Sequence, residues 1–133
     1  MFDYQYDITT PLPFLKEVSE HYANVYFFED ASPTDILLYA ERELSQIPSI
    51  ATYINQIDAH TGESEMTYVF GWECTNDVDL MAGWFQLLQR LGGDVHRPNR
   101  KGMNALDVAR ARLRRMGYSE TQTDQFVQSH LQH

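Results

Sequence analysis

Two sets of residues have the types and spacing that chemistry would need. Glu17 and His21 are four residues apart, so they would share a helix face, where they could bind a metal ion or act as acid and base. Cys74 could act as a nucleophile only if the fold joined it to His60 or His96. The structural alternatives are a surface ion pair for the first set and a small buried thiol for the second.

Motifs with an established catalytic mechanism do not occur in the chain. It has no P-loop, no Gly-x-Ser-x-Gly, no His-Glu-x-x-His and no paired-cysteine metal motif. His130 and His133 lie at the very end, where fraying opposes a preorganised site. We therefore expect no enzyme, no catalytic residue, no cofactor and no metal. A small helical enzyme or metal-binding protein built around Glu17 and His21 is the alternative.

Length and composition predict one folded domain spanning residues 1–133. The hydrophobic content of 43% is ordinary for a globular protein, and the single cysteine excludes an internal disulfide. There is no apolar run of about 18 residues and no signal-peptide pattern at the N-terminus. These features indicate a cytoplasmic protein that does not enter a membrane.

The charge is strongly negative and unevenly placed. Residues 1–70 hold 12 acidic and 2 basic side chains, a net of −10, and residues 71–133 hold 7 and 8, a net of +1, which together give −9. Such a chain would be repelled by nucleic acid and by anionic membranes, whereas its acidic half could steer a basic protein into contact. Solubility alone is the plainer explanation of the charge.

Apolar spacing and capping residues predict a series of helices. Ser32-Pro33 is a strong helix start, and Ser119 with Gln122 is a capping box. Three helices are predicted to begin at Pro11, Pro33 and Pro48. Three more are predicted over 64–74, over 77–91 with Asn76 as its cap, and over 104–116 with Asn104 as its cap. The last predicted helix begins at Ser119. The segment 24–31 is compatible with strand, loop or helix.

The most informative stretch runs from Leu87 to Ala109. It reads as the end of a helix, a stop at Gly92 and Gly93, a polar loop and a new helix start. Leu87-Leu88-Gln89-Arg90-Leu91-Gly92-Gly93-Asp94-Val95 and Gly102-Met103-Asn104-Ala105-Leu106-Asp107-Val108-Ala109 resemble the junction between two ankyrin repeats. The Thr-Pro-Leu-His signature of that family is intact nowhere.

The helix-start pattern of this stretch recurs upstream. Asn104-x-Leu106-x-x-Ala109 is matched by Ser64-x-Met66-x-x-Val69, with Gly62 placed as Gly102 is, and again by Thr34-x-Ile36-x-x-Tyr39. The intervals of 40 and 30 residues bracket the family period of about 33, and the longer one predicts an insertion within 70–78. The resemblance implies an all-α fold of stacked helix pairs, with an N-terminal cap at 1–31 and about three repeats over 32–133. An unrelated helical bundle is the alternative.

Similarity to ankyrin repeats implies a protein-binding module, in which loop tips and first helices contact the partner. The positions that match the family's loop tips and first helices give the expected contact residues, and Trp72 is added because aromatic side chains near acidic ones are typical of interfaces. The set is Asp58, His60, Glu63, Glu65, Tyr68, Trp72, Arg97, Asn99, Arg100, Lys101 and Asp107. We expect an acidic inhibitor or immunity-type protein that masks a basic partner. Self-association through the acidic and basic ends is an alternative. The arginines Arg110, Arg112, Arg114 and Arg115 are interpreted as a solvated helix face rather than a nucleic-acid site.

Overall fold

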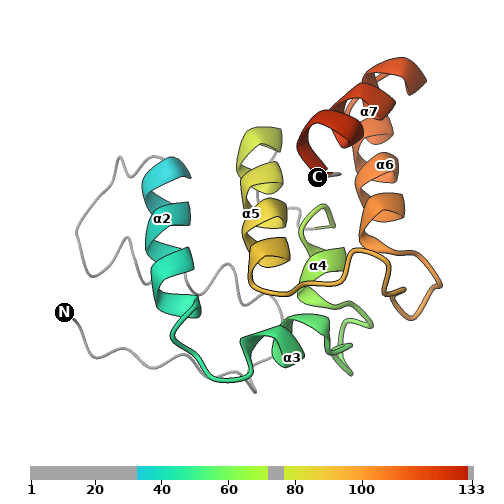
Figure 1. The fold of residues 1–133 in the computed structure, drawn as a ribbon. Helices are drawn as coiled ribbons and strands as arrows, with labels where there is room; N and C mark the ends of the chain where they lie inside the picture. Colours follow the sequence, from blue (N-terminus) through green and yellow to red (C-terminus); the bar gives the residue numbers. More distant parts are fainter. Residues whose placement is uncertain (1–32, 72–76, 132–133) are drawn as a thin grey trace.

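The computed structural model describes residues 33–71 and 77–131, which are helical and contain no strand (Figure 1). In chain order the helices are α2 (Pro33–Leu44), α3 (Ile50–Asn55), α4 (Glu65–Tyr68), α5 (Val78–Arg90), α6 (Ala105–Arg115) and α7 (Glu120–Phe126), which continues as the π-helical turn η1 (Val127–Leu131). The prediction of an all-α chain is confirmed for these ranges. No described helix has the length and apolarity that crossing a membrane requires.

Side chains at the helix starts explain where the helices begin. Asn104 accepts a hydrogen bond from the backbone N–H of Asp107, whose carboxylate in turn accepts from the N–H of Asn104. Ser119 with Gln122 and Ser64 with Thr67 form the same reciprocal box. Each box satisfies donors that a helix start leaves without partners. The capping box predicted at Ser119 is therefore confirmed, and so is the cap at Asn104.

Three predicted boundaries need correction. Helix α4 ends at Tyr68, well before residue 74, and the aromatic and β-branched composition that follows it disfavours helix. Helix α5 is capped by Asp77, whose carboxylate accepts from two backbone N–H groups, one residue after the predicted cap at Asn76. Helix α3 begins at Ile50, two residues after Pro48.

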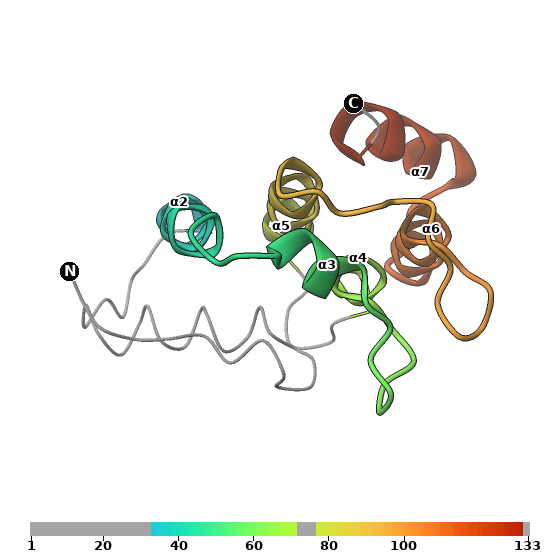
Figure 2. The same ribbon diagram turned by 60° about the horizontal axis from the view of Figure 1, so that its bottom comes forward.

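The helices form two rows, best seen in Figure 2. One row contains α2, α5 and the α7–η1 segment, and the other contains α3, α4 and α6. The rows are joined by contacts of α4 with α5 and of α6 with α7. Helix α2 thus lies beside α5 and not in the row of α4 and α6, and Thr34 lies inside α2. This corrects the third copy of the helix-start pattern, which had predicted that Thr34 opens a helix equivalent to those two.

The core lies between the rows and contains the apolar faces that the spacing predicted. Met81, Phe85 and Leu88 of α5 are buried, and so are Ala109 and Leu113 of α6. Phe70 packs edge-on against Phe85, with ring centroids 6.0 Å apart. Burial of such aromatic and aliphatic side chains is the main stabilising contribution in a fold of this size.

One arginine predicted to be exposed is buried. Arg112 is 6% exposed, and its Nη1 donates a hydrogen bond to the backbone oxygen of Phe70 at 3.3 Å. A guanidinium can be buried where acceptors are available for its several N–H donors. Arg112 is therefore a link between α6 and the turn after α4, not part of the solvated face.

An ion pair between Glu41 and Arg90 joins α2 to α5. The Nε and Nη2 atoms of Arg90 lie 3.0 and 2.8 Å from the two carboxylate oxygens. The hydrogen bonds from Arg90 lower the pKa of the Glu41 carboxyl below its ordinary value of 4.5. The folded pKa is therefore lower than the unfolded one, so the stabilisation is present above pH 4.5 and lost as pH falls through the folded value.

We predict that Glu41→Gln lowers the free energy of unfolding by about 0.5–1 kcal/mol at neutral pH, because the pair is two-pronged but exposed. The difference from the parent should vanish in acid, which urea denaturation at a series of pH values would measure. Glu43→Gln on the same helix is the control, since Glu43 approaches Arg42 only to 3.6 Å. A Glu41→Gln effect that persists unchanged in acid would contradict the interpretation.

Candidate partner-binding surface

The loops that precede α4 and α6 share one local design. Gly62 and Gly102 each stand two residues before the capping residue, with φ of +74° and +82°. Glycine accepts this left-handed conformation at little cost, and the following cap then starts the helix. The similarity between Gly62-x-Ser64 and Gly102-x-Asn104 that the sequence predicts is therefore present in the backbone as well.

The two loops are bonded to each other. The backbone N–H of Arg100 donates to the oxygen of Gly62 at 2.9 Å, and its Nη2 donates to the oxygen of Ala59 at 2.9 Å. The space beside Gly62 is filled by the side chain of Arg100, whose Cβ would lie 3.1 Å from a Cβ added there. A second side chain could not enter this contact without displacing Arg100.

Asn99 is the centre of this connection. Its Nδ2 donates to both carboxylate oxygens of Glu63, at 3.0 and 3.2 Å. Its Oδ1 accepts from the backbone N–H groups of Lys101 and Met103, at 2.9 and 3.0 Å. With 7% of its surface exposed, Asn99 organises its own loop and fixes it to the preceding one. This corrects its expected role as a residue that a partner would touch.

Asn55 and Asp58 fix the base and the tip of the first loop. Asn55 donates through Nδ2 to the oxygen of Gly92 and accepts through Oδ1 from the N–H of Asp94, at 3.0 and 2.7 Å. Asp58 accepts through Oδ2 from the N–H groups of His60 and Thr61. The Asp58 carboxylate and the Asn55 amide thus both form hydrogen bonds with backbone groups. We refer to the two loops, residues 56–64 and 92–104, as the loop platform.

Glu65 also differs from its predicted role. It is 1% exposed, and Tyr53 donates from its hydroxyl to Oε1 at 3.5 Å. A buried carboxylate at the first position of α4 is favourably placed for the helix dipole, but a partner cannot reach it. Tyr68 is only partly exposed and packs against the core. Trp72 lies outside the described residues.

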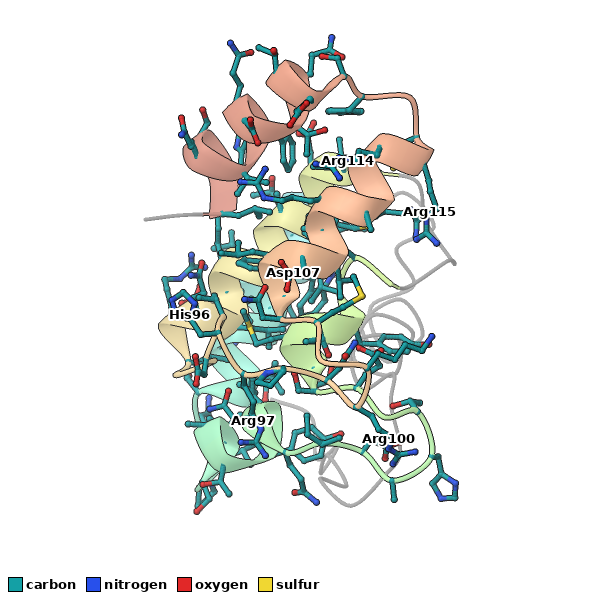
Figure 3. The ribbon with its side chains drawn as sticks, turned by 90° about the vertical axis from the view of Figure 1, so that its right-hand side faces the viewer. His96, Arg97, Arg100, Asp107, Arg114 and Arg115 are labelled. Carbon is teal, nitrogen blue, oxygen red and sulfur yellow. The ribbon has the colours of Figure 1, made fainter. Side chains whose placement is uncertain are left out.

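The remaining predicted residues lie on the surface. His60, Arg97, Arg100, Lys101 and Asp107 are exposed, whereas Asp58 and Glu63 are partly exposed and occupied by the loop hydrogen bonds. The labelled side chains of Figure 3 show Arg97 and Arg100 on the loop at the lower end of α6 and Asp107 on the helix above them. The exposed part of the platform is therefore mainly basic.

Arg114 and Arg115 lie on the same side of the molecule as Arg97 and Arg100, and they are not among the predicted contact residues. Both are exposed at the upper end of α6 (Figure 3). A signal for them was present in the sequence, because residues seven and eight positions after Asp107 return to its face of a helix. The interpretation of these arginines as a solvated face does not use their shared helix face with Asp107.

The predicted chemical groups do not gather within the described residues. His60 and His96 are exposed on different loops. No group of three or more His, Cys, Asp and Glu side chains arranged for a metal ion occurs in residues 33–71 and 77–131. Glu17, His21, Cys74 and His133 lie outside these ranges.

Comparison with protein-family models, with curated proteins and with solved structures found no match to this chain. The functional interpretation therefore depends on the arrangement of its own residues.

We predict that Asn99→Ala lowers the free energy of unfolding by about 2 kcal/mol or more, because two backbone N–H groups and the Glu63 carboxylate lose their partner. Urea denaturation followed by circular dichroism would measure this. Arg97→Ala, two residues away and exposed, is the matched control and should change stability by less than about 0.5 kcal/mol. Equal effects of the two substitutions would show that Asn99 does not hold the loops together.

Proposed function

We propose that this chain is a protein-interaction module of ankyrin-like helix pairs, which binds and masks a basic partner protein as an acidic inhibitor or immunity-type protein does. The observation that carries the interaction-module part of the proposal is the loop platform, in which one buried amide and several backbone hydrogen bonds fix two loops side by side. A binding surface that is ordered before contact loses less conformational entropy on association.

The repeated design of the platform supports the ankyrin-like part of the proposal. The caps Ser64 and Asn104 open α4 and α6 in the same manner, and these two helices lie next to each other in one row. Stacked pairs of this kind leave their loops along one edge, where adjacent tips make a continuous surface. Exposed side chains on a rigid frame are typical of recognition rather than of packing.

The charge of the chain supports a basic partner. Nineteen acidic and ten basic side chains give a net charge of −9, and the excess is concentrated in residues 1–70. A negative field of this size accelerates encounter with a positive surface and disfavours acidic competitors. Long-range attraction of this type weakens as salt shortens the Debye length.

The test is affinity capture from the native lysate with the full chain as bait, at about 50 mM and about 500 mM salt. We expect one basic protein to be retained near one-to-one at low salt and largely released at high salt. Bait carrying Asn99→Ala should retain less of it, since the platform is loosened, while Arg42→Gln, on helix α2 and outside the platform, should retain as much as the parent. Retention that does not respond to salt, or an acidic protein as the main ligand, would contradict electrostatic masking.

A further inference from the structure

Nine of the ten lysines and arginines lie within residues 33–71 and 77–131, and they fall into two groups. In the first group, Arg90 pairs with Glu41, Arg110 with Asp124 and Arg42 with Glu43, and Arg112 is buried. The second group is exposed and makes no ion pair within residues 33–71 and 77–131, and it consists of Arg97, Arg100, Lys101, Arg114 and Arg115. We call this group the cationic end face.

The cationic end face consists of two groups of cations at opposite ends of α6 (Figure 3). Arg97, Arg100 and Lys101 come from the loop before α6, and Arg114 and Arg115 come from the last turn of the helix. The 11 residues of α6 separate these two groups by about 16 Å, at 1.5 Å per residue. Asp107 lies between them, but its carboxylate already accepts a hydrogen bond at the helix N-terminus.

A solvated end is the simpler interpretation, because the last unit of a stack needs a polar outer surface. That requirement would be met by side chains of both signs. Here five of the ten basic residues of an acidic chain lie in the loop before α6 and in its last turn, and Asp107 is the acidic residue of α6 itself. Neighbouring like charges within each group repel one another, so a bound anion lowers the electrostatic energy.

The loop group is also preorganised. The guanidinium of Arg100 is held by the oxygen of Ala59, and its stem lies over Gly62. The backbone around Lys101 is fixed by the amide of Asn99. These cations are exposed, but the loop that carries them is bonded to its neighbour and loses little freedom when a ligand arrives.

We propose that the cationic end face binds an acidic, extended segment of a partner protein, lying along α6 with carboxylates at both ends. An extended chain advances about 3.3 Å per residue, so about five residues span the helix and about eight reach both groups. Four of the five cations are arginines, whose forked guanidinium binds carboxylates in two-point fashion. A continuous phosphate backbone is less suitable, because Asp107 and the net charge of −9 oppose it. The cationic end face shares Arg97, Arg100 and Lys101 with the loop platform of the proposed function, but its binding to an acidic segment is tested without the basic partner.

The test is a titration of the ¹⁵N-labelled full chain with an octaglutamate peptide, followed by NMR, which detects weak binding and locates it. We expect shifts to concentrate at residues 97–101 and 114–115, and octaglutamine to produce none. The double variant Arg114→Gln/Arg115→Gln should bind about fivefold more weakly, and Arg97→Gln/Lys101→Gln similarly. Arg42→Gln, an exposed arginine on α2, is the matched control and should bind as the parent does.

Other results would overturn the proposal. Shifts spread over the molecule, an equal response to octaglutamine, or an equal loss in Arg42→Gln would show that the face has no particular affinity for acidic segments. Tighter binding of an eight-nucleotide single strand at the same residues would assign the face to phosphate. Self-association that the Arg114→Gln/Arg115→Gln variant abolishes, measured by light scattering, would make a second copy the ligand. None of these results depends on whether a basic partner is captured from a lysate.

Discussion

The hydrogen bonds of the Asn99 side chain are the constraint on which the surface of this protein depends. One amide group closes its own loop through Lys101 and Met103 and reaches the preceding loop through Glu63. An amide serves both purposes because it carries its donors and its acceptor on separate atoms. A carboxylate in its place would face Glu63 with like charge. Together with the hydrogen bonds of Arg100 and Asn55, this amide fixes the position of the two loops relative to each other.

The same contact decides which charges the loops present outward. Glu63 and Asp58 carry the negative charge of the first loop, and both are occupied as acceptors within the structure. The cations of the second loop form no ion pair with a carboxylate of the described residues, and their side chains are exposed to solvent. Acidic composition therefore does not produce an acidic platform. Net charge describes the long-range field of the chain, whereas hydrogen bonding decides the character of each local surface.

Residues close in sequence made the helices predictable. Caps at Asn104 and Ser119, glycines at fixed offsets and the apolar stripe of α5 all act within one or two turns, so their effect can be read without knowing the fold. The burial of Glu65, Asn99 and Arg112 could not be read in this way, because each depends on groups 12 to 42 positions away along the chain. Their residue types are usually exposed, and contacts between elements distant in the sequence place them inside. The sequence therefore predicted which loops precede the helices but not which of their polar side chains are buried.

The two charged regions have different physical consequences for a partner. A net charge of −9 acts at distances of about a Debye length and selects which molecules approach. The cationic end face acts only at contact, where a guanidinium and a carboxylate can form two hydrogen bonds. A basic partner that also carries an acidic segment would be attracted by the first and oriented by the second. The opposite signs therefore need not compete, since one governs the rate of encounter and the other the geometry of the complex.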